Sequence, residues 1–230
     1  MRTFLRNKKA LAGAAILFLY LLMATVGPYV VPLEVEQHPE RALRPPSLAH
    51  PLGTDYLGRD VLAQIVHGSR DVLFVAFLAA LFAVLIAIGV GILAGLKGGL
   101  VDQVLMTLVN MMLTIPHLPV MMIFAAVFHV RDPFSFALIL ALWMWAGLAR
   151  AIRSQVLSLR EREFIEAAKI LKLGTPHIVF KEILPNVMPY VAINFVSMMR
   201  GAIVSSVAIM FLGLAPFSAT NWGMMLNMAT

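Results

Sequence analysis

Charged residues are spaced so unevenly along this chain that the gaps between them predict its transmembrane helices. Five long stretches between charged residues contain no Asp, Glu, Lys or Arg, namely 10–33, 72–96, 103–130, 133–149 and 183–199, and no charge follows Arg200. A helix needs about 20 apolar residues to cross roughly 30 Å of hydrocarbon, so each stretch is long enough or nearly so. The pattern therefore predicts an all-α polytopic membrane protein, a bundle of five transmembrane helices.

The segment between the first two spans, 34–71, is too polar and too rich in proline to lie in lipid. We expect it to form an external loop that ends in a short interfacial helix. Thr54 or Asp55 is suited to cap that helix, because both residue types accept hydrogen bonds from the first backbone N–H groups. Apolar residues at helical spacing would place one face of the helix along the membrane surface: Val61, Leu62, Ile65 and Val66.

Two of the spans carry a stripe of polar residues. At 100° per residue, the stripe of the third span covers an arc of about 80° and consists of Gln103, Thr107, Asn110, Thr114 and His117. In the fifth span an arc of about 140° holds Asn186, Tyr190, Asn194, Ser197, Arg200, Gly201 and Ser205. Lipid cannot satisfy such groups, so both stripes must face protein or water.

Hydrogen bonding between packed helices and a translocation path are both open interpretations of these stripes. The residues of a path would be Gln103, Asn110, Thr114, His117, Asn194, Ser197 and Arg200. Arg200 favours a function more than the others do, because a cation in the membrane costs at least ~2.5 kcal/mol on insertion scales. If it faces the path, it could attract a substrate carboxylate.

Proline and glycine mark two further features of the spans. Pro116 and Pro119 should kink the third span around His117. His117 and His129 are 12 residues apart and have no carboxylate beside them, which favours structural roles over a metal site. In the second span, the G-x-x-x-G spacing of Gly91 and Gly95 predicts close contact with another helix.

Composition and charge agree with a membrane location. The chain is 60% hydrophobic and only 13% charged, and its net charge of +6 comes from residues that border spans, which argues against a nucleic-acid partner. If the N-terminus is cytoplasmic, twelve Lys and Arg residues flank the spans inside, Arg2 and Arg6 among them, and five outside. Because basic residues resist translocation, this distribution predicts a multi-pass protein of the plasma or inner membrane with its N-terminus in the cytoplasm.

The long inside loop, 150–182, is predicted to form two short helices. Residues 160–172 are strongly polar, yet Phe164, Ala168 and Leu171 recur at helical spacing with Ile165 alongside, which indicates an amphipathic helix. The sequence predicts that Gly174 stops this helix, that Thr175 caps the next one and that Pro176 takes its first position.

The same loop resembles the cytoplasmic EAA loop of ABC importer permeases. The resemblance rests on Glu166-Ala167-Ala168, followed by Gly174 and by Leu184-Pro185, although the glycine of the family stands where this chain has Lys172. It implies a coupling helix that docks into a cleft of an ATPase subunit. The residues that would form this coupling loop are Phe164, Ile165, Glu166, Ala167, Ala168, Leu171, Gly174, Thr175 and Pro176.

A second match is similar to the second permease subunit of dipeptide, oligopeptide and nickel importers. It comprises the run H-P-L-G-T-D-Y-L-G-R-D at 50–60, Gly68-Ser69-Arg70, F-L-G-L at 211–214 and N-W-G at 221–223. The resemblance implies three parts: an N-terminus and first span at 1–33, the external segment at 34–71, and a permease core at 72–230. Relatives continue into a sixth span beyond N-W-G, whereas this sequence ends at Thr230, so the sixth span is expected to be missing.

The resemblance also implies partners: a homologous sister permease, one or two ABC ATPase subunits, an extracytoplasmic solute-binding protein and membrane lipid. No G-x-x-x-x-G-K-[ST] loop occurs in the sequence, so ATP and Mg would be bound by the ATPase subunits. We expect no catalytic residue, metal or cofactor in this chain itself.

Di- and oligopeptides are the expected substrates, with nickel and oligosaccharides as alternatives within the family. A secondary transporter is the rival class, but the predicted spans contain no Asp or Glu that could carry a coupling ion. A membrane-embedded enzyme is disfavoured because the sequence offers no carboxylate pair, metal cluster or activated nucleophile in the membrane.

Overall fold

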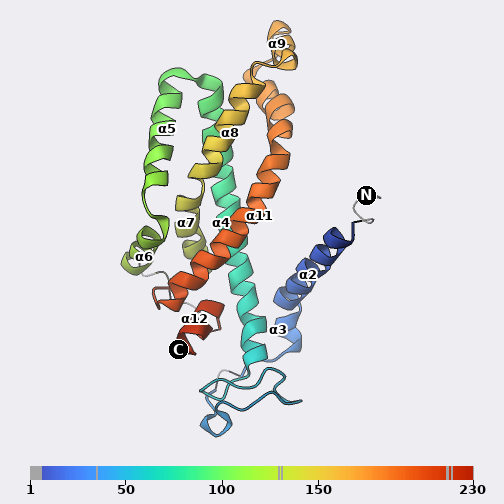
Figure 1. Ribbon diagram of the computed structural model, residues 1–230, viewed down its shortest axis with the longest axis vertical. Helices are drawn as coiled ribbons and strands as arrows, with labels where there is room; N and C mark the ends of the chain where they lie inside the picture. The colour runs from blue at the N-terminus through green and yellow to red at the C-terminus, as the bar shows by residue number, and fades with distance from the viewer. Residues whose placement is uncertain are drawn as a thin grey trace. The chain divides into compact units, whose positions relative to one another are not determined.

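A computed structural model of the chain describes residues 7–34, 36–128, 130, 132–215, 218 and 220–229 (Figure 1). Arg2, Arg6 and His129 lie outside these residues. In the described part, β pairing is limited to one isolated bridge between Thr54 and Asp60, and the rest of the regular structure is helical. The chain divides into two compact units, a terminal unit (Met1–Phe74 with Ser206–Thr230) and a central unit (Val75–Ser205).

The terminal unit contains α2 (Lys8–Thr25), α3 (Gly27–Val30), the 3-10 turn η1 (Pro39–Arg41), the start of α4 (Val61–Lys97), the end of α11 (Leu184–Phe211) and α12 (Trp222–Met228). Asn7 caps α2, because its side chain accepts hydrogen bonds from the backbone N–H groups of Lys9 and Ala10 at 3.1 and 3.2 Å. Of the residues of α2, only Ala24 is buried. This helix therefore presents apolar side chains on nearly all of its faces.

The separate interfacial helix expected before the second span is not formed. Instead, α4 is one continuous helix of 37 residues that begins at Val61. Its N-terminus is capped by neither Thr54 nor Asp55: the carboxylate of Asp60 accepts from the backbone N–H of Ala63 at 2.8 Å. A helix of this length extends about 55 Å, so it exceeds the roughly 30 Å of the hydrocarbon core.

The central unit contains most of α4, then α5 (Gly99–Thr114), α6 (His117–Val127), α7 (Pro133–Met144), α8 (Ala146–Leu159), α9 (Glu163–Ile170), the short α10 (Thr175–His177), the π-helical turn η2 (Ile178–Ile183) and most of α11. The kink expected at Pro116 is confirmed, since α5 and α6 are bent by 88°. A second bend, of 49°, separates α7 from α8. Asp132 caps α7 by accepting from the backbone N–H of Ser135 at 2.8 Å.

By length and apolar composition, three of the described helices can cross a membrane, and five spans result if each bent pair counts as one. The predicted fold class, an all-α polytopic helical bundle, is confirmed. The helix of the fourth span is longer than predicted, however: α8 runs on through Arg150 and Arg153 to Leu159, because these side chains bind Asn110 and Asp102 without ending the helix. The last long helix continues through Arg200 to Phe211, in agreement with the polar stripe predicted as far as Ser205.

The core of the central unit lies where α4, α8 and α11 meet α9 and η2. Its fully buried members include Ala87, Ile152, Ile165, Ile183 and Val187. A Cβ atom on Gly91 would lie 2.8 Å from Ile152, and one on Gly95 would lie 2.7 Å from Val156. The close approach predicted from G-x-x-x-G is thus confirmed, and α8 is the helix that packs there.

Candidate coupling loop and translocation path

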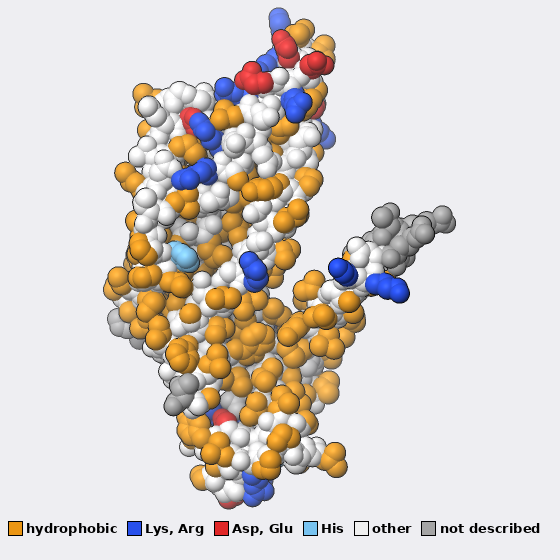
Figure 2. Space-filling model, in the orientation of Figure 1, with side chains coloured by type: hydrophobic (Ala, Val, Ile, Leu, Met, Phe, Trp, Pro, Cys, Tyr) orange, Lys and Arg blue, Asp and Glu red, His pale blue; other side chains and the backbone are white. Residues whose placement is uncertain are grey.

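Helix α9 is amphipathic, but its buried face is narrower than the sequence suggests. Ile165 and Ala168 are buried in the core of the central unit, at 0% and 4% exposure. Phe164 and Leu171, which share the predicted apolar face with Ala168, are instead 40% and 71% exposed. Only one side of the helix meets this chain, so an apolar face remains uncovered. Figure 2 shows acidic and basic side chains gathered at this end of the central unit.

The end of α9 differs from the predicted stop at Gly174. Lys172 adopts the left-handed conformation with a φ of 54°, and the backbone N–H groups of Leu173 and Lys172 donate to the carbonyls of Ala168 at 3.0 Å and Lys169 at 2.9 Å. These two bonds define a Schellman motif, which favours glycine at the left-handed position. The helix therefore stops where the family has its glycine, and Lys172 takes that place.

Gly174 and Thr175 also have roles other than the predicted ones. Gly174 is extended, with φ −65° and ψ 155°, and stands at the N-cap of α10 without a side-chain bond, while Thr175 is the first helical residue. Pro176 follows Thr175 within the first turn, close to its predicted place. The backbone conformation at position 174 is therefore one that residues other than glycine also adopt.

A π-helical turn, η2, joins α10 to α11 and packs against α9. Within it the N–H of Leu184 donates to the carbonyl of Val179, five residues back. The following residue, Pro185, has no N–H and its ring would collide with the carbonyl four residues back in an α-helix. The Leu184-Pro185 pair thus accounts for the wider turn, and π-turns are frequent at functional sites.

The polar stripe of the third span is broken by the bend between α5 and α6. Gln103, Asn110 and Thr114 are exposed on α5, and Thr114 donates to the Asn110 carbonyl of its own helix at 3.1 Å. Asn110 also accepts from Arg150 of α8 at 2.6 Å. His117 lies beyond the 88° bend, so the prediction of one straight arc was wrong. The cause is Ile115, whose extended backbone is typical of a residue before proline.

His117 nevertheless meets the stripe of the fifth span. A cavity of about 250 Å³ is lined by His117 of α6, Asn194 and Ser197 of α11, and by Trp143, Met144 and Met198. The structure thus brings three of the seven predicted path residues together. Gln103, Asn110, Thr114 and Arg200 do not line this cavity; Arg200 is exposed on α11.

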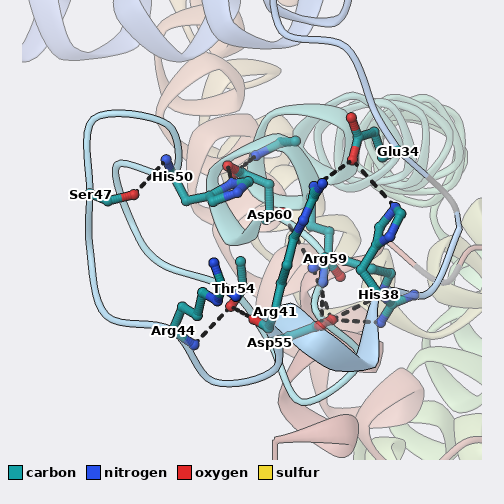
Figure 3. Close-up of polar contacts among 12 residues, drawn as sticks. Glu34, His38, Arg41, Arg44, Ser47, His50, Thr54, Asp55, Arg59 and Asp60 are labelled. Atoms are coloured by element: carbon teal, nitrogen blue, oxygen red, sulfur yellow. Dashed lines mark hydrogen bonds and ion pairs between the residues drawn. The ribbon is translucent and has the colours of Figure 1, made fainter.

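The loop between α3 and α4, residues 31–60 (the α3–α4 loop), is organised by Asp55 (Figure 3). The Asp55 carboxylate accepts from the backbone N–H groups of Leu57 and Arg59, both at 2.9 Å, and from the side chains of Arg59 at 2.9 Å and Gln64 at 3.1 Å. Burial alone would raise the pKa of Asp55, but the hydrogen bonds from Arg59 and Gln64 outweigh it and hold the pKa below its ordinary value.

Other residues of the 50–60 run close the same loop. The Thr54 hydroxyl donates to the carbonyl of Arg41 and accepts from the N–H of Arg44 at 2.9 Å. Gly58 has a φ of 77°, and a Cβ atom there would lie 1.9 Å from the carbonyl oxygen of His38. His50 and Asp60 pair at 2.8 Å. The motif is therefore a self-contained structure, which its spacing alone did not reveal.

The N-W-G segment contacts the start of α4 within the terminal unit. The Trp222 indole N–H donates to the carbonyl of Ile65 at 3.2 Å, and the Asn221 side chain accepts from the N–H of Gly223 at 3.0 Å. Beside it lies a mostly apolar cavity of about 900 Å³, lined among others by Tyr20, Arg59 and Trp222. No sequence signal pointed to this cavity. Among the described residues, no group of three or more His, Cys, Asp or Glu side chains is placed to hold a metal ion.

A bundle of long apolar helices, with two bent helix pairs and an exposed amphipathic helix between two spans, defines a polytopic helical membrane protein. Residues 87–230 match the family of binding-protein-dependent transport system inner membrane components, and residues 1–46 match the N-terminal transmembrane domain of oligopeptide transport permease C. The chain belongs to this family, whose members are the permease subunits of ABC importers.

Curated relatives cover nearly the whole chain. It is 36% identical to the dipeptide transport system permease protein DppC of Bacillus subtilis, over 98% of this chain and 71% of the relative. The oligopeptide transport system permease protein OppC of the same organism is 31% identical over 98% of this chain and 74% of the relative. OppC of Mycobacterium bovis is 32% identical, over 93% and 74% of the two chains. The predicted resemblance to this subunit type is confirmed.

Proposed function

We propose that this chain forms half of a translocation pore for di- and oligopeptides and that α9 docks on a separate ABC ATPase subunit. The observation that carries this proposal is the division of α9 into two faces. Ile165 and Ala168 fix the helix to the core, while Phe164, Ala167 and Leu171 are exposed. A helix held on one side and apolar on the other is suited to enter a groove of a partner.

Charge supports a protein partner rather than lipid at this face. Glu163, Glu166 and Lys169 are exposed beside the apolar residues. Charged side chains of both signs around an apolar centre resemble the polar rim and apolar core of a protein interface. The ATPase subunits, one or two in number, would bind ATP and Mg, and this chain would carry their motion into the membrane.

The exposed polar groups of α5 and α11 support the proposal that a second permease subunit forms the other half of the pore. Gln103, Asn110 and Ser197 are not covered by this chain, and lipid cannot satisfy them. A homologous sister permease would face them across a polar path. On this path Arg200 would attract the carboxylate of a peptide, and His117, Asn194 and Ser197 would offer hydrogen bonds to its amide groups.

The peptide substrate is inferred from relatives that are named dipeptide or oligopeptide permeases. An extracytoplasmic solute-binding protein would deliver the peptide and select it. We place the N-terminus in the cytoplasm of a plasma or inner membrane because Lys8, Lys9, Lys97 and the basic residues of α8 and α9 would then share the cytoplasmic side. The apolar side chains of α2, nearly all of which are not buried by this chain, would contact lipid or the sister permease.

The test is reconstitution of the chain with the products of neighbouring genes. Affinity purification of this chain is expected to recover an ABC ATPase and a second permease, and vesicles holding the complex and its binding protein should import a labelled peptide only with ATP. Uptake of nickel or an oligosaccharide in place of the peptide would correct the proposed substrate but would still support an ABC importer permease. Ion-driven uptake without any ATPase would overturn the proposal.

A further inference from the structure

An ion pair joins α5 to α8 close to the α9 loop (residues 160–176). The guanidinium of Arg153 on α8 meets the carboxylate of Asp102 on α5 with two parallel bonds: Nε donates to Oδ1 at 2.8 Å, and Nη2 donates to Oδ2. Both side chains are largely withdrawn from solvent, with 31% exposure for Arg153 and 16% for Asp102. A two-bond pair of this kind fixes direction as well as distance, unlike a single contact.

The position of Asp102 connects this pair to the polar face of α5. Asp102 stands in the first turn of α5, where the helix dipole favours a negative charge, and Gln103 is the next residue. Two turns further along, Asn110 accepts from Arg150 at 2.6 Å. Helices α5 and α8 are therefore joined by two polar contacts, and both contacts involve the helix that carries Gln103, Asn110 and Thr114.

On its other side α8 packs closely against α4. Gly91 and Gly95 allow Ile152 and Val156 to approach the α4 backbone closely, and Arg160 donates to the carbonyl of Gly95 at 3.2 Å. Immediately after Arg160 the chain enters the α9 loop, whose Ile165 and Ala168 belong to the same apolar core as Ile152. A displacement of α9 must therefore reach α8, and α8 has one charged link to α5 among the described residues.

We propose that Asp102 and Arg153 are positioning residues for coupling. Their ion pair passes a movement of α9 through α8 to α5 and so to the polar groups that would line the path. This inference rests on the proposed function, since it assigns a role within the same transport cycle. A pair that only stabilises packing would leave the ratio of ATP hydrolysed to peptide imported unchanged once the complex has assembled.

The experiment uses the complete complex with its binding protein in vesicles and measures ATP hydrolysed per peptide imported. Asp102→Asn and Arg153→Gln are each expected to raise this ratio at least fivefold, at roughly the lower end of typical coupling free energies, with ATP hydrolysis in detergent unchanged. Asp102→Glu retains the charge and should restore most of the coupling. So should the exchanged pair, Asp102→Arg with Arg153→Asp.

Glu161→Gln is the matched control, because it removes an exposed ion pair with Arg160 and leaves the link between α5 and α8 intact. An unchanged ratio in an assembled Asp102→Asn complex would overturn the inference. So would failure of all charge-removing variants to assemble, since the pair would then be structural. If the unaltered complex imports no peptide or contains no ATPase, the proposed function fails instead.

Discussion

Two loops of this protein carry the residues by which its family is recognised, and their physical organisation is opposite. In the α3–α4 loop, the motif residues bind other residues of this chain: Asp55 accepts from Arg59 and from Gln64 of α4, and Thr54 bridges Arg41 and Arg44. In the α9 loop, the motif residues Glu166 and Ala167 are exposed. The first motif therefore builds a local structure, whereas the exposure of the second agrees with the proposed contact with another protein.

The comparison extends to backbone strain. Each loop has one non-glycine residue with positive φ, Leu43 at 52° in the α3–α4 loop and Lys172 at 54° in the α9 loop. The α3–α4 loop also places Gly53 and Gly58 at positive φ, whereas in the α9 loop the left-handed position that ends α9 is taken by Lys172. A lysine there costs about 1–2 kcal/mol relative to glycine. Four predictions, from the largest effect to the smallest, test whether one loop is structural and the other is an interface.

The largest effect on transport is expected at Glu166, and the three effects on stability follow in decreasing order. Reversing its charge with Glu166→Lys should lower ATP-driven peptide uptake at least tenfold, as roughly 1.4 kcal/mol of lost docking energy already would, because Glu166 lies exposed on α9. Membrane insertion and thermal stability should stay as they are. Uptake by vesicles is the measurement, and Glu161→Lys, an exposed site outside α9, is the control; equal losses in both variants would contradict an interface role for Glu166.

Next comes Gly58 in the α3–α4 loop. Gly58→Ala should destabilise the protein by about 3 kcal/mol, since its new Cβ atom would lie 1.9 Å from the His38 carbonyl oxygen. Gly99→Ala separates the two causes, because Gly99 also has positive φ but has no atom within 4 Å of an added Cβ. For this control, thermal unfolding in detergent should show a loss of about 1–2 kcal/mol in the free energy of unfolding. Similar losses of stability in Gly58→Ala and Gly99→Ala would mean that the α3–α4 loop shifts to make room for the added Cβ atom.

Acid should weaken the α3–α4 loop through Asp55. Because the folded state lowers the pKa of Asp55 below its ordinary value of 3.8, its contribution is present at higher pH and is lost as the pH falls through the folded pKa. At neutral pH, Asp55→Asn should cost about 2 kcal/mol. The difference in unfolding temperature between the two proteins should stay constant from pH 6 to about pH 4 and shrink only below 3.8, as the pH falls toward the folded pKa of Asp55; a difference that stays constant below 3.8 as well would show that Asp55 acts without its charge.

The smallest effect is expected at Lys172, and it is a gain. Lys172→Gly should stabilise the end of α9 by about 1 kcal/mol, because glycine adopts positive φ without strain. Hydrogen exchange of the α9 backbone measures this locally. Lys172→Ala removes the charge and keeps the strain, so it should give no gain. Gly174→Ala should also be nearly neutral, since Gly174 has a negative φ.

The sequence predicted the fold class well because membrane spans follow from hydropathy alone. It also located the proline bend near Pro116 and the close contact at Gly91 and Gly95, since each of these depends on local chemistry. It failed where the outcome depended on tertiary contacts. The charges of Arg150 and Arg153 looked like the end of a span, but pairing with Asn110 and Asp102 lets α8 continue.

The local structure around the candidate site differs from the prediction in several details. Spacing placed Phe164, Ala168 and Leu171 on one apolar face of α9 with Ile165 alongside, whereas only Ile165 and Ala168 are buried in the core. Gly174 was expected to end α9 because glycine is the usual stop, whereas Lys172 does so. The meeting of His117 with Asn194 and Ser197 follows from an 88° bend, an angle that periodicity along a straight helix cannot supply.

The most direct test of the account compares two exposed leucines, one from each loop. The sequence contains no cysteine, so Leu171→Cys and Leu48→Cys, at 71% and 105% exposure, can each carry a single photoreactive benzophenone. In the assembled complex, the label at position 171 is predicted to cross-link the ATPase subunit, and the label at position 48 is not. Cross-linking of the ATPase from position 48 but not from 171 would contradict the account.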